Sequence, residues 1–215
     1  MASVNLVDYL PGQVVRALGV AFSPSRPRAC GPLASTVDDA DRAGDIVDRI
    51  RDQIKKAPPR KSRFDLHEAI KEVMVLARSA VTENGVSVQT RLTEGVLQVE
   101  GDRVQLQQVV LNLILNAVEA MSTVEAGPRE LLLSTAQTQT GGVLVSVRDS
   151  GPGIDPDDLD RVFDTFYTTK SSGVGMGLSI CRSIIEAHGG RLWAEVSEPG
   201  GAVFQITLAS PESSS

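Results

Sequence analysis

Residues that bind metals or form cross-links are scarce in this chain. Its 215 residues include two cysteines, Cys30 and Cys181, and two histidines. The two cysteines lack the paired spacing of a zinc site, and they are too few for a disulfide framework. We therefore expect a reducing, cytoplasmic setting, with Cys181 as a small buried residue in an apolar helix.

Basic charge and long apolar runs are also lacking. The formal net charge is −6, which is the wrong sign for a nucleic-acid-binding surface. No run of about 18 apolar residues occurs, so we expect no transmembrane helix. The N-terminal stretch is interrupted by Pro11, Gly12 and Arg16 and is not typical of a signal peptide. Hydrophobic residues nevertheless make up 41% of the chain, which is enough for a packed core.

The pattern along the chain predicts four regions. Prolines interrupt residues 1–34, to which we assign no function. Apolar residues recur three and four apart over 35–56, which predicts an amphipathic helix ended by the linker 57–60. This helix needs a partner, either a second helix in a dimer or the surface of its own domain. We expect a folded domain over 61–209 and a disordered tail over 210–215.

The folded domain is predicted to alternate between helices and strands. Helices are expected at 66–80, 101–122 and 177–188, with Asp65 and Asp102 as N-caps of the first two. Strands are expected at 86–92, 129–138, 143–150, 191–198 and 201–209. Because hairpins join several of these strands, we predict an α+β fold, a two-layer sandwich of a mixed sheet with helices on one face.

Two asparagines stand out in the apolar helix at 101–122. Asn112 and Asn116 are four residues apart and project from one face, and Glu119 follows one turn later. Asparagine is a poor helix former, and a buried amide must find a partner. The pair either bridges neighbouring elements or presents amide oxygens to a metal ion such as Mg²⁺.

Glycines cluster after the strand that ends at Asp149. Gly151 and Gly153 allow a sharp turn and a close approach, and the aspartate can accept a hydrogen bond from an exocyclic amine. Further on, the glycines at 173, 175 and 177 open a helix, where exposed backbone N–H groups attract anions. Lys170 precedes them and could reach a phosphate. Each signal alone also fits an ordinary turn, a flexible loop or a surface charge.

The order of these stretches resembles the ATP-binding catalytic domain of bacterial sensor histidine kinases. This superfamily also holds the DNA gyrase B-type and Hsp90-type ATPases, with a Bergerat-type fold. The stretches "LNLILNAVEAM", "DSGPGI", "FDTFYTTK" and "GVGMGLSI" look like its N, G1, F and G2 boxes. The resemblance covers about residues 62–208. Residues 35–60 resemble the second helix of the kinase dimerisation hairpin.

The resemblance implies roles at the matching positions. Asn116, with Asn112 nearby, would hold the Mg²⁺ that bridges the ATP phosphates, and Asp149 would accept from the adenine amine. The region between Asp155 and Gly175 would form a lid, with Lys170 facing the phosphates. The other residues expected to bind the nucleotide are Glu119, Gly151, Gly153, Ile154, Phe163, Gly173, Gly175, Gly177 and Leu178.

One position separates kinases from ATPases in this superfamily. Gyrase-like members carry a glutamate where Asn112 stands, and that glutamate activates the attacking water. Asparagine cannot act as a general base at neutral pH. We therefore expect a protein-histidine kinase that holds Mg-ATP without hydrolysing it quickly.

The resemblance implies a phosphoacceptor histidine on the first helix of the hairpin, in the 35 or so residues before Val37. That stretch is interrupted by prolines and holds no histidine. His67 lies at the start of the catalytic domain, and His188 lies at a helix end that suits the helix dipole. We therefore expect transfer in trans, to a histidine-bearing kinase or phosphotransfer protein, with a response regulator as an indirect partner and a possible dimer through helix 35–56. No catalytic residue in cis is assigned.

Several alternatives stay open. The chain could be a truncated or frame-shifted kinase, a separate ATP-binding subunit, or a degenerate kinase whose ATP binding regulates a partner. A rival from another class is a non-enzymatic adaptor that joins a kinase dimer through helix 35–56. A serine kinase of an anti-sigma network shares the nucleotide motifs, but it usually lacks a dimerisation helix.

Overall fold

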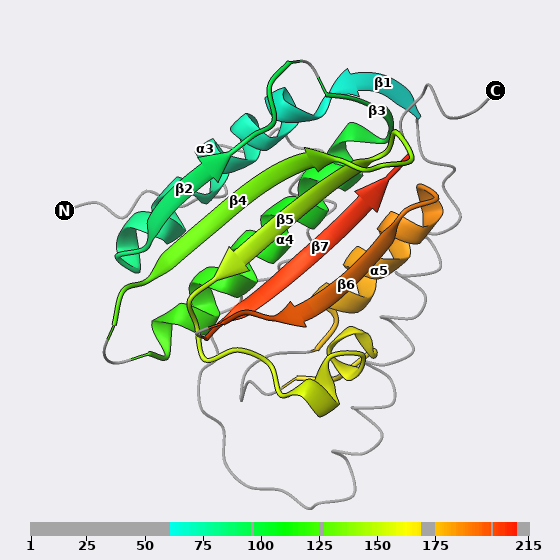
Figure 1. The fold of residues 1–215 in the computed structure, drawn as a ribbon. Coiled ribbons are helices and arrows are strands. Elements are labelled where there is room, and N and C mark those ends of the chain that lie inside the picture. Colours follow the sequence, from blue (N-terminus) through cyan, green and yellow to red (C-terminus); the bar gives the residue numbers. More distant parts are fainter. Residues whose placement is uncertain (1–60, 96, 125–126, 169–174, 199, 210–215) are drawn as a thin grey trace, which may run out of the picture. The chain divides into compact units, whose positions relative to one another are not determined.

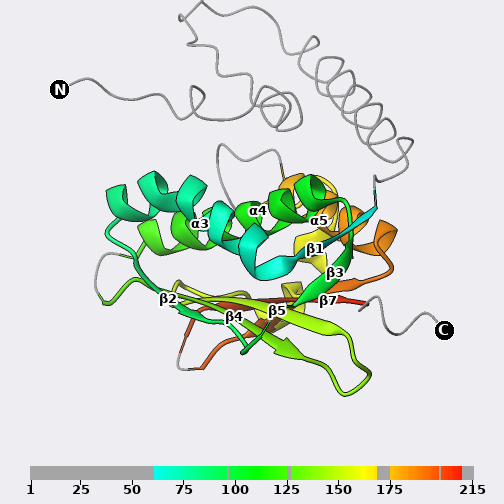
Figure 2. The same ribbon diagram turned by 90° about the horizontal axis from the view of Figure 1, so that it is seen from above.

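The described residues form a sheet covered by helices on one face. The computed structural model describes residues 61–95, 97–124, 127–168, 175–198 and 200–209, which belong to the compact unit Pro58–Ser215. Figure 2 shows all three described α-helices on the same side of the sheet. The predicted α+β sandwich is thus confirmed. The predicted helix 35–56 and the regions 1–34 and 210–215 lie outside the described residues and stay predictions.

The main sheet is mixed and has five strands in the order β2-β4-β5-β7-β6 (Figure 1). β2 pairs with β4 in parallel, and the other neighbours are antiparallel. The antiparallel pairs include the expected hairpins, β4 with β5 and β6 with β7. The strands are β2 (Ser87–Arg91), β4 (Glu130–Gln137), β5 (Val143–Asp149), β6 (Arg191–Val196) and β7 (Ala202–Leu208).

Three helices close the inner face of this sheet. They are α3 (Leu66–Glu83), α4 (Arg103–Ser122) and α5 (Gly177–Ala187). Asp65 caps α3 by accepting from the His67 N–H, and Asp102 caps α4 by accepting from the N–H groups of Val104 and Gln105. Such caps satisfy helix amides that have no partner within the helix, and both were predicted from the sequence.

The core lies between the helices and the sheet. Alternate residues of β5 are buried, as the period of two requires for a strand with one face covered. The α4 face that packs on them includes Val109, Leu113 and Ile114, each fully buried. Val104, at the start of this helix, remains 42% exposed and so lies outside the core face.

Four small elements were not predicted. β1 (Ser62–Asp65) pairs antiparallel with β3 (Gln98–Gly101), making a separate two-stranded sheet. Two short 3₁₀ turns, Pro156–Asp158 and Arg161–Phe163, follow the glycine-rich turn after β5. No helix in the described part of the chain is long and apolar enough to cross a membrane.

Candidate nucleotide-binding site

Asp149 is a buried carboxylate at the end of β5. Its side chain is 4% exposed, and Oδ1 accepts from the Gly151 N–H at 2.8 Å and from the Ala202 N–H at 3.3 Å. Burial raises the pKa of this carboxyl, and the two amides partly oppose that rise. The amides fix Oδ1 and leave the rest of the carboxylate to accept from a ligand.

Glycines surround Asp149 because no side chain fits there. A Cβ at Gly201, whose φ is +98°, would lie 1.9 Å from the Asp149 carbonyl oxygen. A Cβ at Gly151 would lie 2.9 Å from Asp149 Oδ1 and 3.4 Å from Cβ of Ala120 on α4. At Gly153, with φ of +83°, it would lie 3.0 Å from the Gly201 carbonyl oxygen. The turn after β5 is thus pressed between α4 and the β6–β7 turn.

Asn112 and Asn116 lie on α4, two turns and one turn before Ala120. Both are half-buried. The Asn112 amide nitrogen lies 3.7 Å from the sulfur of Cys181 on α5, a weak hydrogen bond. The Asn116 side chain makes no hydrogen bond with any residue in the described ranges. A half-buried amide without a partner among the described residues has the capacity to bind a ligand.

Three apolar residues predicted for the site, Ile154, Phe163 and Leu178, lie in the core or against it. Phe163 is 5% exposed and packs edge-on against Phe204, with ring centroids 6.2 Å apart. Ile154 and Leu178 are half-buried and pack against the core. Cys181 is fully buried, and burial raises the pKa of its thiol to about 12, which confirms it as an inert core residue.

Gly175 and Gly177 differ in their surroundings: Gly175 makes a close backbone contact, and Gly177 is exposed at the start of α5. Gly175 has φ of +70°, its carbonyl accepts from the Phe166 N–H, and a Cβ there would lie 2.5 Å from the Phe166 carbonyl carbon. Phe166 itself adopts φ of +71°, which is rare outside glycine. Gly175 therefore serves a close backbone contact. Gly177 begins α5, is exposed and has open space at its Cβ position, so its amide end is accessible.

The predicted roles of Lys170, Gly173 and Glu119 stay predictions. Lys170 and Gly173 lie outside the described residues. Glu119 is exposed on α4. Among the described residues, no cluster of three His, Cys, Asp or Glu side chains could hold a metal ion.

Both histidines hold the fold together. His67 is 7% exposed, and its Nε2 lies 3.0 Å from the Thr135 hydroxyl of β4. His188 is 6% exposed, accepts at Nε2 from the Asp102 N–H and donates from Nδ1 to the Ile184 carbonyl. The sequence suggested that His188 suits the helix dipole. The ring lies at that end of α5 and also ties it to the N-cap of α4, with Nε2 as the acceptor.

Sequence reasoning missed Gly201, Ala202 and Ser150. Gly201 lies in the β6–β7 turn and Ala202 begins β7, both more than 50 positions from Asp149. For this stretch the sequence predicted only the "PGG" turn and a strand over 201–209. Ser150 lies inside the predicted motif "DSGPGI", but no role was predicted for it. Its hydroxyl accepts from the Glu130 N–H at 2.9 Å and donates to the Pro128 carbonyl at 2.8 Å.

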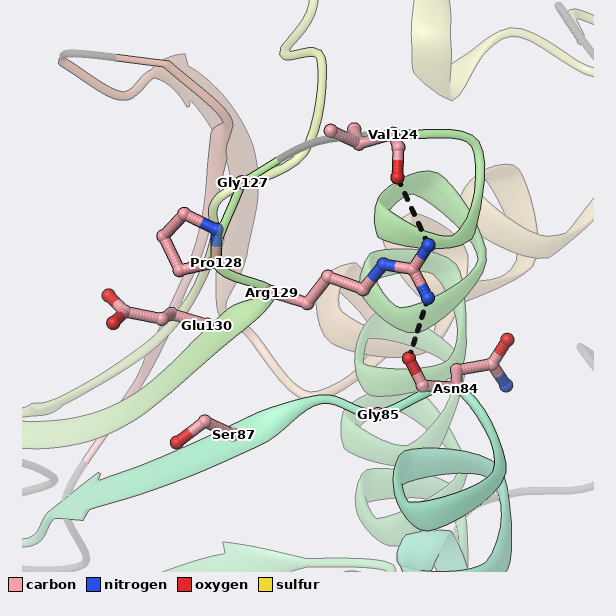
Figure 3. A pocket seen from close by; sticks show the side chains of 8 residues that line it. All are labelled: Asn84, Gly85, Ser87, Val124, Gly127, Pro128, Arg129 and Glu130. Carbon is pink, nitrogen blue, oxygen red and sulfur yellow. Dashed lines mark hydrogen bonds between the residues drawn. The ribbon is translucent and has the colours of Figure 1, made fainter.

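A separate cavity of about 450 Å³ opens where α3 and α4 end (Figure 3). None of the predicted site residues lines it. Arg129 crosses it and donates to the carbonyls of Asn84 and Val124, at 2.8 and 3.0 Å. This cavity belongs to the loops that follow the two helices rather than to the asparagine and glycine site.

Comparison with known proteins places this arrangement in a family. Residues 101–212 match the family described as "Histidine kinase-, DNA gyrase B-, and HSP90-like ATPase". The chain is 39% identical over 201 residues to the sensor protein FixL of Bradyrhizobium diazoefficiens, covering 94% of the chain and 39% of FixL. It is 37% identical over 186 residues to the sensor histidine kinase TmoS of Ectopseudomonas mendocina, covering 86% of the chain and 19% of TmoS. The chain thus spans less than half of each of these relatives.

Solved structures agree with this placement. The catalytic domain of histidine kinase ThkA superposes with a TM-score of 0.63 at 36% identity, covering 71% of this chain and 98% of that domain. ThkA in complex with response regulator protein TrrA gives a TM-score of 0.66 at 28% identity, covering 98% of this chain and 59% of that one. The chain therefore belongs to the histidine kinase-, DNA gyrase B- and HSP90-like ATPases, and its folded domain is a sensor histidine kinase catalytic domain.

Proposed function

We propose that this chain binds Mg-ATP and transfers the γ-phosphoryl group to a histidine that lies outside these 215 residues. In that reaction an imidazole nitrogen forms the N–P bond, the bond from phosphorus to the ADP oxygen breaks, and the ring proton leaves to solvent. Such transfer needs positioning and charge stabilisation more than covalent help from the protein. The chain would thus act in two-component signal transduction.

The observation that carries the proposal is that Asn116 and Asp149 lie on two adjoining elements, each with a side chain able to bind one part of a nucleotide. Asp149 has one carboxylate oxygen held by two amides, as a fixed acceptor for the adenine amine requires. Asn116 offers a half-buried amide that has no partner among the described residues. Ala120, one turn beyond Asn116, lies against Gly151 of the Asp149 turn. Adenine and phosphate groups of one nucleotide would thus meet residues from two adjoining elements.

The residues present fit a bound Mg²⁺ at the phosphate end. The amide oxygens of Asn116 and Asn112 would hold it together with the phosphates, and the ion would neutralise phosphate charge. The Asn112 nitrogen faces Cys181, which leaves its oxygen for such a role. Lys170 and the amides near Gly175 and Gly177 would serve the phosphates, and Ile154, Phe163 and Leu178 the apolar surroundings.

Asn112 also favours a kinase over a hydrolase. A general base at position 112 would activate a water molecule for attack on ATP. The amide of asparagine cannot accept a proton at neutral pH. The ATP would then keep its γ-phosphoryl group until an acceptor arrives.

The expected partners follow from the relatives. ThkA was crystallised with response regulator protein TrrA. By similarity, we propose that a response regulator receives the phosphoryl group from the acceptor histidine. A dimer through helix 35–56 is a further prediction about residues outside those described. An adaptor that binds ATP without transferring phosphate is the alternative.

The test is the affinity of the purified chain for ATP with Mg²⁺, measured by calorimetry, for wild type and Asn116→Ala. We expect wild type to bind, and the variant to bind roughly tenfold or more weakly, because an amide ligand to a charged centre is lost. Gln107→Ala is the matched control. Gln107 also carries an amide on α4, but it donates to Glu72 on α3.

The control should bind ATP as wild type does. A wild-type chain that does not bind Mg-ATP would contradict the proposed function. Binding that is equal in wild type and Asn116→Ala would remove the role given to Asn116 and leave ATP binding in place.

A further inference from the structure

The Ser150 hydroxyl joins the turn after Asp149 to a distant segment. It accepts from the Glu130 N–H at 2.9 Å and donates to the Pro128 carbonyl at 2.8 Å. The Met121 sulfur lies 3.6 Å away, at the end of α4. One half-buried hydroxyl therefore contacts both the last turn of α4 and the chain entering β4.

These bonds decide where β5 leaves the sheet. Leu131 and Asp149 are the last partners in the ladder between β4 and β5. One step further, the Ser150 N–H still donates to the Glu130 carbonyl at 3.1 Å, but the Glu130 N–H is taken by the serine hydroxyl. A side-chain oxygen thus replaces a main-chain acceptor, so the backbone can turn at once into Gly151.

The position of Gly151 bears directly on Asp149. The Gly151 N–H donates to Asp149 Oδ1 at 2.8 Å, and Gly151 is the residue that follows Ser150. A shift of the Ser150 backbone would move this donor, and the buried carboxylate would lose the shorter of its two hydrogen bonds. Small displacements matter because recognition of an amine depends on the position and direction of its acceptor.

The segment that Ser150 binds is itself anchored. Arg129, between Pro128 and Glu130, donates to the carbonyls of Val124 and Asn84, which follow α4 and α3 (Figure 3). The Ser150 hydroxyl thus holds the Asp149 turn to a segment that is fixed to the ends of two helices. One of these, α4, carries Asn112 and Asn116.

We propose that Ser150 is a positioning residue for adenine recognition: its hydroxyl fixes the Asp149 carboxylate relative to the end of the asparagine helix. The inference rests on the proposed function, because it assumes that Asp149 accepts from the adenine amine. It goes further by assigning a part of the nucleotide selectivity to a residue that need not touch the nucleotide.

The experiment compares ATP with inosine triphosphate, which carries an oxygen where adenine has its amine. The affinities of both nucleotides are measured with Mg²⁺ on the full 215-residue chain, for wild type, Ser150→Ala, Ser150→Cys and Ser150→Thr. Ser150→Cys keeps the size and weakens the hydrogen bonds, so it serves if the alanine variant does not fold. Ser146→Ala is the control, since Ser146 lies on β5 and its hydroxyl makes no hydrogen bond within the described residues.

We expect the preference for ATP over inosine triphosphate to fall roughly three- to tenfold in Ser150→Ala and Ser150→Cys, the effect of one displaced hydrogen bond. Ser150→Thr and Ser146→Ala should keep the wild-type preference. A purely structural role would lower the unfolding temperature and leave the preference unchanged, which would overturn the inference. Equal weakening of both nucleotides would overturn it too.

Three outcomes distinguish failure of this inference from failure of the proposed function. Wild type that binds neither nucleotide would remove both. Wild type that binds ATP, with a preference that falls in Asp149→Asn but not in the Ser150 variants, would overturn the role of Ser150 alone. Wild type that binds the two nucleotides equally would remove the adenine role of Asp149, and with it this inference, while Mg-ATP binding stands.

Discussion

At the scale of single residues, Asp149 shows a conflict between stability and binding. Burial disfavours its charged form, whereas acceptance of an adenine amine requires an acceptor that is fixed and kept from water. The amides of Gly151 and Ala202 reduce this cost without removing it. Under the proposed function, the binding role of this carboxylate would offset its cost to the fold.

We therefore predict that Asp149→Asn lowers ATP affinity without lowering stability at neutral pH. The pKa of the Asp149 carboxyl is raised above its ordinary value of 3.8 in the folded chain. Stability should thus fall as pH rises from 3.8 through the raised value, because the unfolded chain ionises first. Asparagine cannot ionise, so this decline should be missing in the variant.

The measurement is the difference in unfolding temperature between wild type and Asp149→Asn, from pH 4 to pH 8. The variant should gain on wild type as the pH rises. A variant that loses stability relative to wild type over this range would contradict the account, because it would show that the charged form is favoured in the fold.

Some of these residues could be predicted from sequence and others could not. Asn112 and Asn116 were visible because polar residues four apart interrupt an apolar helix. Asp149 was visible because it ends a strand next to two glycines. Ser150 was not, because its partners Pro128 and Glu130 lie 22 and 20 positions away and serine fits any turn.

At the scale of elements, the β6–β7 turn packs directly against the turn that follows Asp149. Gly201 packs so closely on Asp149 that a Cβ would lie 1.9 Å from its carbonyl oxygen. Gly200, next to it, has one neighbour near its Cβ position among the described residues, the Gly151 carbonyl oxygen at 3.9 Å. Of the two adjacent glycines, Gly200 therefore has room for a Cβ atom and Gly201 does not.

We predict that Gly201→Ala lowers the free energy of unfolding by more than about 2 kcal/mol, since alanine would be strained at φ of +98° and would displace the Asp149 backbone. ATP affinity should fall with it. Gly200→Ala is the matched control and should unfold like wild type in urea. Equal midpoints for the two variants would show that the turn can move aside without cost.

Element boundaries followed from local signals where these were strong. α4 begins after Asp102, as the cap predicted, and α5 ends one residue before the expected boundary. The pairing of β1 with β3 was not predictable, because each has four residues and its partner lies about 35 positions away. The bond from Asp102 to His188 spans 86 positions for the same reason.

At the scale of the whole molecule, the sheet brings three distant segments to one place. β5 supplies Asp149, β7 supplies the Ala202 amide, and α4 lies over both with its two asparagines. The histidines serve the same architecture, one joining α3 to β4 and the other joining α5 to the start of α4. Neither is placed to receive a phosphoryl group, since each is buried and hydrogen-bonded.

We therefore predict that the chain alone, given labelled Mg-ATP, acquires no acid-labile phosphate. A separately made dimerisation hairpin from a related kinase should become labelled when this chain is added, because its exposed histidine can reach the γ-phosphoryl group. Asn116→Ala should abolish most of the transfer, and a hairpin with glutamine in place of its histidine should stay unlabelled. Label on this chain that disappears in His67→Gln would show that α3 opens to expose its histidine. ATP binding without transfer to any histidine hairpin would favour the non-catalytic adaptor.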